Sequence, residues 1–294
     1  MIFSVIVPFL NEELYIEQCI QALLGQDFNQ NEYELIFIDN GSTDASVEIV
    51  RRFPEIALFY ESKKSAYAAR NRGLKEARGE IIAFTDADCI VSKDWLMHIY
   101  QGIRESGATI ALGQRCFLLN IPLTLKIFED YENAKVEYIL QNCAKRYFFA
   151  NNNNMAVKKI AFERYGYFLT RYVGTASDTE FLQRCISQDP DLKVAYLNEM
   201  KITHLEVKNI RTWLKKNNLY GRYNIMVEEL FDYAPLNYAT KLKIFNYLIK
   251  KNNYLFLQSI FYFFLLVIGD IAYAVGRITG NLIFNKNDIW FTHR

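Results

Sequence analysis

Short apolar runs alternate with helix-like segments along the first part of the chain. The runs are rich in β-branched and aromatic residues, as buried strands are, and comprise Ile2–Val7, Glu34–Ile38, Ala57–Tyr60 and Ile81–Phe84. The segments between them carry apolar side chains at helical spacing and comprise Glu12–Leu24, Val47–Val50 and Ala66–Ala77. Strands that alternate with helices of this length predict an α/β fold with a Rossmann-like, mostly parallel central sheet.

The alternation loosens beyond residue 105. An apolar run at Thr109–Leu112 and a helix-like stretch at Leu123–Leu140 precede the polar run Asn151–Asn154. We therefore expect one domain over residues 1–230, with a first half at 1–104 and a second half at 105–230 that packs beside the sheet. The chain then becomes basic, aromatic and helical, so a separate segment is expected at 231–294.

The charge distribution supports a different surface in the last third. The 294 residues carry a formal net charge of only +1, which argues against a protein that binds nucleic acid by neutralising phosphates. However, residues 1–200 contain 21 Lys or Arg and 27 Asp or Glu, whereas residues 201–294 contain 13 and 6. The excess of positive charge therefore belongs to the C-terminal third.

Two local patterns bear on the cellular compartment. The five cysteines are scattered and show no spacing typical of a zinc site or a disulfide framework. The N-terminal apolar run has no basic region before it and no small-residue cleavage site after it. We therefore expect a strand there rather than a signal peptide, and a catalytic part that stays in the cytosol.

Acidic residues follow two of the expected strands. Asp86 and Asp88 come directly after Ile81–Phe84, and Asp39 ends the strand before the turn Asn40-Gly41-Ser42. In a parallel sheet the ligand crevice lies beyond the carboxyl ends of the strands, where paired carboxylates suit Mg²⁺ or Mn²⁺. A solvated turn and a helix cap are the alternative interpretations of these two patterns.

Three motifs in a fixed order closely resemble those of the family 2 glycosyltransferases, which have the GT-A fold. The first runs from Val5 to Glu12, the second is Ile38-Asp39-Asn40-Gly41-Ser42-Thr43-Asp44, and the third leads from Ala68-Ala69-Arg70-Asn71-Arg72-Gly73 to Asp86-Ala87-Asp88. The resemblance covers residues 1–222, and its specificity lies in the set. It implies that Asp39 and Arg70 lie at the nucleotide base, with Pro8 and Glu12 in the same pocket. It also implies Asp86 near the ribose or the metal, and Asp88 as the ligand of a divalent metal, Mn²⁺ or Mg²⁺.

The resemblance continues in the second half. Asn152-Asn153-Asn154-Met155-Ala156 is similar to the segment that lines the sugar and acceptor cleft, which implies roles for Asn153 and Asn154. Ser177-Asp178-Thr179-Glu180-Phe181 resembles the family's Glu-Asp motif, in which the aspartate is the general base. Ser177 replaces the usual acid, so only Asp178 is carried over. His204 matches the position of a histidine that completes the metal site in many relatives.

The signature of processive polysaccharide synthases is missing, because Lys208 stands where its glutamine would be. The resemblance therefore implies an inverting, metal-dependent enzyme that transfers one sugar from a nucleotide-sugar donor, with UDP-sugar favoured. A glycan or a lipid-linked molecule is the expected acceptor, in cell-surface polysaccharide or glycolipid synthesis. Two alternatives are a nucleotidyltransferase and a non-catalytic sugar-binding or scaffold module. The first would normally carry a Gly-rich basic loop after its first strand, which Pro8–Glu12 lacks.

The C-terminal segment has the composition of a membrane-associating helix. Tyr254–Ala272 contains 15 apolar residues in 19, close to the length of about 20 residues that a span requires. Four lysines precede it: Lys241, Lys243, Lys250 and Lys251. A buried aromatic helix, an interfacial helix pair and a true span are all open, and each membrane arrangement implies the cytoplasmic face. Gly276 and Gly280 favour a close approach between helices.

Overall fold

The computed structural model describes residues 1–117, 123–170, 176–205 and 210–283. The chain divides into two compact units that interleave along the sequence. The first comprises Met1–Leu119, Ala150–Arg171 and Arg184–Glu206, and the second comprises Asn120–Phe149, Tyr172–Gln183 and Val207–Arg294. The expected domain boundary near residue 230 stays a prediction.

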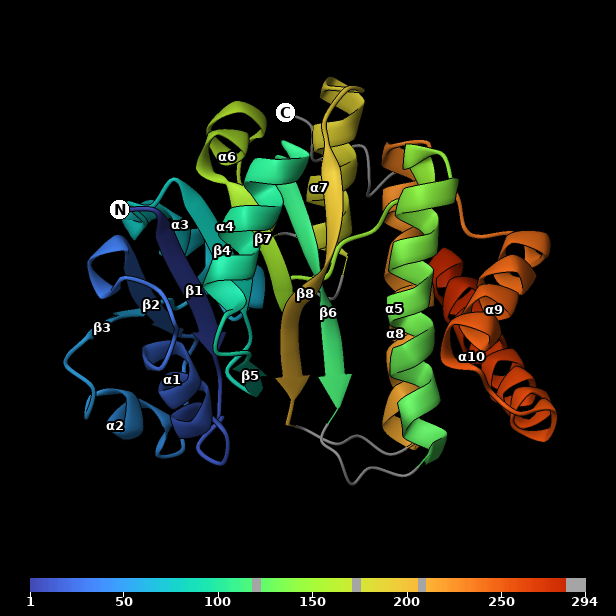
Figure 1. Ribbon diagram of the computed structural model, residues 1–294, viewed down its shortest axis with the longest axis horizontal. Helices are drawn as coiled ribbons and strands as arrows, with labels where there is room; N and C mark the ends of the chain where they lie inside the picture. Colours follow the sequence, from blue (N-terminus) through green and yellow to red (C-terminus); the bar gives the residue numbers. More distant parts are fainter. Residues whose placement is uncertain (118–122, 171–175, 206–209, 284–294) are drawn as a thin grey trace. The chain divides into compact units, whose positions relative to one another are not determined.

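The first unit is built on an eight-stranded sheet with the order β3-β2-β1-β4-β7-β6-β8-β5 (Figure 1). Its strands are β1 (Phe3–Phe9), β2 (Tyr33–Asp39), β3 (Ile56–Tyr60), β4 (Ile81–Thr85), β5 (Cys89–Val91), β6 (Ile110–Phe117), β7 (Asn154–Lys158) and β8 (Val194–His204). The four strands from β3 to β4 are mutually parallel. β7 is antiparallel to β4 and β6, β8 is parallel to β6, and β5 is antiparallel to β8. The predicted α/β fold with a mostly parallel sheet is confirmed.

Helices cover both faces of the parallel strands. On one face, Val5 and Val7 of β1 pack in a single apolar cluster with α1 (Ile16–Leu24) and α4 (Trp95–Ser106). On the other face, Gly73 of α3 (Ala66–Glu76) lies so close to β1 that an added Cβ would be 2.6 Å from the Ile6 side chain. Because both faces are buried, every residue of β1 is buried and all but Ser4 are apolar, so the strand does not alternate.

The elements expected in the first 85 residues are confirmed, with shifts of a few residues at their ends. The helix expected from Glu12 begins only at Ile16, and the strand expected to end at Val7 continues to Phe9. β5, α4 and β7 were not predicted, nor were the helices over Lys159–Tyr165 and Ser177–Gln188. The shorter elements are α2 (Ser46–Val50), α6 (Lys159–Tyr165), and the 3₁₀ turns Gln30–Glu32 and Lys145–Tyr147.

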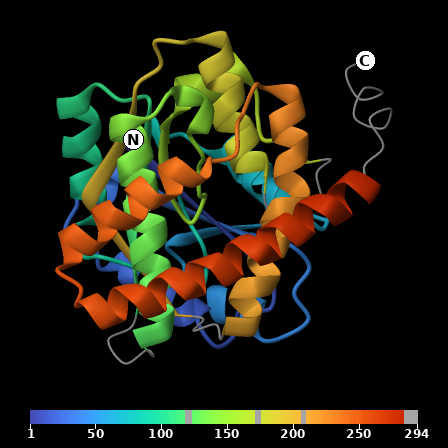
Figure 2. The ribbon, with the colours of Figure 1, turned by 90° about the vertical axis from the view of Figure 1, so that its right-hand side faces the viewer.

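The second unit contains the long helices α5 (Leu123–Asn142), α8 (Ile210–Leu230), α9 (Tyr238–Asn252) and α10 (Phe256–Ile283). Figure 2 shows α10 lying across α8. Glycines make this approach possible: a Cβ at Gly276 would overlap the carbonyl oxygen of Asn218, and one at Gly280 would lie 2.6 Å from that of Arg222. The close helix approach expected at Gly276 and Gly280 is confirmed.

A partly buried polar network joins β1, β2 and the turn before β4. The Ser4 hydroxyl donates to Glu34 Oε1 at 2.6 Å and accepts a hydrogen bond from the Gly79 amide at 2.8 Å. Glu34 also accepts from the Arg78 amide at 2.7 Å and from Arg78 Nε at 2.8 Å. Burial raises the pKa of Glu34, but the hydrogen bonds from Ser4 and Arg78 and the Arg78 charge outweigh it, so the net pKa is lowered.

We predict that Glu34→Gln lowers the free energy of unfolding by about 1 kcal/mol at pH 7. A carboxylate whose folded pKa is depressed stabilises the fold above its unfolded pKa, and this contribution is lost as the pH falls through the folded pKa. Urea unfolding should therefore show the gap between wild type and variant closing below about pH 4. The exposed Glu55→Gln is the control, and a gap that persists unchanged at low pH contradicts the role of the Glu34 charge.

Candidate active site

The carboxyl ends of the parallel strands bring the predicted nucleotide-site residues to one edge of the sheet. Phe9 at the end of β1 lies opposite Asp39 at the end of β2, and β4 ends at Thr85 directly before Asp86. Pro8 is buried on β1, paired with Ile38. The expectation that Asp39, Asp86 and Asp88 fall at a common sheet edge is confirmed.

The turn after β2 is fixed through Asp39 and Asn40. Asp39 Oδ1 accepts hydrogen bonds from the amides of Gly41 at 3.2 Å and Ser42 at 2.9 Å, and Gly41 has the positive φ of 94° that favours glycine. The Asn40 side chain donates to the carbonyls of Glu61 and Lys63 and accepts from the Ser65 amide. Asn40 therefore ties the β2 turn to the loop that leads into α3.

Glu12 lies in the neighbouring loop after β1. Its amide donates to the Ser46 hydroxyl at 2.8 Å, and the Asn11 side chain accepts from the Thr43 amide at 2.8 Å. Asn11 adopts a positive φ of 57°, which asparagine tolerates better than most residues. These bonds hold the β1 and β2 loops together at the edge where Asp39 lies.

Arg70 and Asp86 form an ion pair of 2.6 Å between Nη2 and Oδ1. Arg70 is 5% exposed, whereas the Asp86 side chain is 34% exposed. The Arg70 guanidinium also lies over the Tyr67 ring, 5.5 Å from its centroid. The resemblance implied separate contacts with the nucleotide for these two residues, and the structure adds that they meet. The pairing holds a buried guanidinium beside a carboxylate that still faces solvent.

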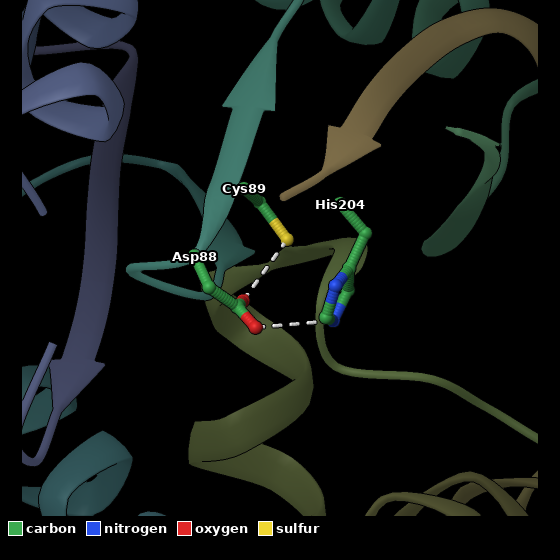
Figure 3. Close-up of side chains that lie close together, drawn as sticks. All are labelled: Asp88, Cys89 and His204. Carbon is green, nitrogen blue, oxygen red and sulfur yellow. Dashed lines mark hydrogen bonds and ion pairs between the residues drawn. The ribbon is translucent and has the colours of Figure 1, made fainter. Parts of the chain in front are cut away.

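Asp88 and His204 lie close enough to bind one metal ion. Asp88 Oδ2 is 3.3 Å from His204 Nε2, and Cys89 Sγ donates a hydrogen bond to Asp88 Oδ1 at 3.5 Å (Figure 3). Candidate ligand atoms of all three residues lie within 4.8 Å of one another. β5 and β8 bring them together, because Cys89 pairs with His204 across these strands and the Leu205 amide donates to the Asp88 carbonyl.

The donor set fits a divalent metal such as Mn²⁺, because a carboxylate oxygen and an imidazole nitrogen are both ligands that it accepts. Burial raises the pKa of the Cys89 thiol, and the charges of Asp88 and Asp86 raise it further. The thiol is therefore protonated and donates to Asp88. Sequence reasoning missed Cys89, whose only signal was its place beside the Asp86-Ala87-Asp88 motif.

The two asparagines expected in the acceptor cleft differ in their contacts. Asn154 Oδ1 accepts from Trp95 Nε1 at 2.9 Å, and its Nδ2 donates to the carbonyls of Gln114 and Met200, both at 2.8 Å. These bonds give the Asn154 side chain a structural role, which leaves its predicted cleft role untested. Asn153 is also buried, but its Oδ1 has no hydrogen-bond partner among the described residues.

Asp178 belongs to the second unit. It lies in the first turn of α7 (Ser177–Gln188), is 7% exposed, and its Oδ1 accepts from the Thr179 amide at 2.8 Å. The N-terminus of a helix favours a carboxylate over its protonated form. The preceding Ser177 is fully buried. The role of Asp178 as a general base stays a prediction. Lys208, at which the signature of processive synthases is missing, lies outside the described residues.

We predict that Mn²⁺ binds to the purified protein and that Asp88→Asn weakens this binding about tenfold or more. His204→Gln should weaken it as well, because each variant removes one ligand. Mn²⁺ titration followed by electron paramagnetic resonance gives the dissociation constants. Cys89→Ser keeps a hydrogen-bond donor to Asp88 and should change little. An equal loss in Cys89→Ser would show instead that the sulfur is a ligand.

The chain matches known glycosyltransferases in sequence and in fold. Residues 4–118 match the sequence model of "Glycosyl transferase family 2". The chain is similar to glycosyltransferase AglE of Haloferax volcanii, with 28% identity over 199 residues, 66% of this chain and 64% of that protein.

Two solved structures have the same fold. The mannosyltransferase PcManGT from Pyrobaculum calidifontis, in complex with GDP-Man and Mn²⁺, has a TM-score of 0.64 and 20% identity over 95% of this chain and 76% of its own. S. aureus TarS 1–349 in complex with UDP has a TM-score of 0.57 and 22% identity, over 86% and 72%. In the sequence comparison, the chain spans just under two thirds of the length of AglE. On this evidence residues 4–118 carry the sequence pattern of glycosyl transferase family 2, and the chain has a GT-A fold.

Proposed function

We propose that this chain transfers a single sugar from a nucleotide-sugar donor to a glycan or lipid-linked acceptor, with inversion at the anomeric carbon. The observation that carries the proposal is the sheet edge at which Asp39, the Arg70–Asp86 ion pair and the Asp88–His204 pair lie together. The match to the family model supports the reaction class, and the geometry of these side chains supports the separate roles proposed for them.

The nucleotide is assigned to the part of the edge formed by β1, β2 and α3. A base presents hydrogen-bond donors on its edge, which the second carboxylate oxygen of Asp39 can accept while Oδ1 stays bonded to the turn amides. Arg70 is held by Asp86 and Tyr67 and so keeps its orientation without a ligand. Pro8 and Glu12 complete the pocket. A preformed pocket reduces the entropy lost on binding.

UDP is the favoured nucleotide. S. aureus TarS was solved with UDP, and the Pyrobaculum enzyme was solved with GDP-Man and Mn²⁺. Both therefore support a nucleoside diphosphate as the leaving group, and the second supports a divalent metal. Asp88 and His204 are the residues that would hold that metal here. When bound, it would neutralise the charge that develops on the leaving diphosphate.

Asp178 is proposed as the base that takes the proton of the acceptor hydroxyl. A positioned carboxylate typically contributes about 10²–10⁴-fold to the rate as a general base. Direct attack by the hydroxyl opposite the leaving group breaks the bond to the diphosphate and inverts the anomeric centre. Asn153, with an acceptor oxygen that lacks a partner among the described residues, is proposed to bind a hydroxyl of the sugar or the acceptor.

The acceptor and the location are proposed together. α10 is long and apolar enough to cross a membrane, with a mean hydropathy of 1.9 in its most apolar window. We assign the chain to the cytoplasmic face of a membrane, where a lipid-linked acceptor or a precursor of a cell-surface polysaccharide is available. This assignment requires a surface that binds lipid.

Isothermal titration of UDP, GDP and dTDP, each with and without Mn²⁺, tests the donor site. We predict Mn²⁺-dependent binding of UDP that is about tenfold or more weaker in Asp88→Ala. Binding of GDP instead would keep the transferase and change the donor class. If none of the three binds, the chain is a scaffold rather than a transferase.

We predict that Asp178→Asn abolishes transfer while leaving nucleotide binding intact, because the amide cannot accept the proton. The loss should be about 10²–10⁴-fold in kcat, measured as UDP released with acceptor present. Unchanged UDP affinity by titration is the internal control for folding. An active Asp178→Asn variant would exclude the assignment.

A further inference from the structure

One face of α10 carries a continuous apolar stripe that is exposed in the described structure. Its members are 41–81% exposed: Leu257, Ile260, Phe261, Phe264, Ile268, Ile271, Val275, Ile278 and Leu282. Their spacing of three or four residues places them within an arc of about 100° around the helix. Thr279 borders this apolar stripe, and its hydroxyl donates to the carbonyls of Val275 and Gly276. The stripe therefore presents hydrocarbon over more than six turns.

The opposite face of α10 packs against α8 and α9 of the same unit and makes charged and polar contacts with both. Asn218 Nδ2 of α8 donates to the Ala272 carbonyl at 3.2 Å, and Arg277 forms an ion pair with Glu228. Asp270 forms an ion pair of 2.6 Å with Lys241 of α9. Tyr262, Leu265 and Leu266 of α10 also pack in an apolar cluster of this unit, so this side of α10 combines apolar packing with charged and polar contacts. Figure 2 shows α10 running across α8.

These contacts are incompatible with a membrane span by α10. If α10 crossed the hydrocarbon with its partners, α8 would bring its charged residues along: Arg211, Lys215, Lys216, Arg222, Glu228 and Glu229. If α10 crossed alone, Asp270 and Arg277 would enter without their ion-pair partners. Both arrangements place costly charges in hydrocarbon. A helix that lies in the membrane plane keeps every one of these contacts and buries only the apolar stripe.

The exposed lysines of α9 point to anionic lipid. Of the five cations of α9 and α10, Lys241, Lys251 and Arg277 form ion pairs with Asp270, Glu137 and Glu228, whereas Lys243 and Lys250 form none among the described residues. Lys243 and Lys250 are exposed. Basic residues beside an apolar helix face are typical of helices that bind anionic lipid at the interface.

We infer that α10 lies in the plane of an anionic lipid bilayer, with the apolar stripe in the acyl boundary and the α9 lysines at the head groups. This inference rests on the proposed function for the membrane location and adds the arrangement, the face and the lipid. It decides between the interfacial pair and the span that sequence composition leaves open. The transferase is then a monotopic protein.

Flotation of the purified full chain with vesicles tests the stripe and the charge. We expect binding to vesicles that contain phosphatidylglycerol and much weaker binding to pure phosphatidylcholine. Ile271→Asp should weaken binding about tenfold or more. Ile160→Asp on α6 is the matched control, because both isoleucines are 59% exposed on helices. Lys243→Glu/Lys250→Glu should weaken binding to the anionic vesicles only.

Labelling from one side of the vesicle tests the arrangement. Cysteines are introduced at Asn252 and Asn281, exposed residues near the two ends of α10, with the half-buried Cys116 and Cys143 changed to serine. A membrane-impermeant maleimide added outside should label both positions if α10 lies in the plane. The background without introduced cysteines is the control. Labelling of one end only, until detergent is added, would establish a span and overturn the inference.

Two further results separate this inference from the proposed transferase. Ile271→Asp should bind UDP as the wild type does, so vesicle binding without nucleotide binding would refute the transferase alone. Nucleotide binding without vesicle binding would refute the membrane surface alone. If the wild type ignores vesicles and forms a dimer that Ile271→Asp dissociates, measured by light scattering, a second copy covers the stripe and the inference is wrong.

Discussion

The candidate metal site depends on a very short antiparallel pairing. β5 has only three residues, yet its register with β8 sets Cys89 opposite His204 and places Asp88 one residue beyond the pair. A hydrogen bond of 2.7 Å from the Leu205 amide to the Asp88 carbonyl extends the pairing. Backbone bonds thus hold together two side chains that are far apart in the sequence. Their geometry does not depend on loop flexibility, as precise ligand placement requires.

The two carboxylates of the Asp86-Ala87-Asp88 motif have different surroundings and therefore different uses. Asp86 compensates the buried Arg70 guanidinium, whose charge would be costly without a partner. Asp88 instead faces His204 and accepts from Cys89. Because Asp86 is already paired with Arg70, it links the proposed nucleotide pocket to the candidate metal site. Asp88 is left as the carboxylate suited to a metal.

The sequence predicted the parallel half of the sheet well because β1, β2 and β4 are buried on both faces and read as nearly continuous apolar runs. β5 was not predicted because three residues are too few to show a periodicity. β7 was not predicted because it begins within a run of asparagines. The order in which β7, β6 and β8 join the sheet rests on long-range contacts that local pattern does not record. The same holds for the ion pair between Arg70 and Asp86. His204 could be singled out only through the family resemblance, since a lone histidine has no spacing signal.

The C-terminal helix shows why composition and contacts answer different questions. Hydropathy averages over all faces, so a span, a core helix and an interfacial helix can give the same value. In α10 the small residues Gly269, Gly276 and Gly280 gather on the side that meets α8, while large aliphatic and aromatic residues occupy the other. Gly276 and Gly280 admit backbone contact with α8, and Gly269 admits the Trp213 ring of the same helix. The Arg277–Glu228 ion pair between α8 and α10 argues against burial of this side in hydrocarbon. The arrangement of α10 therefore follows from the polarity of its partner α8 rather than from its own mean hydropathy.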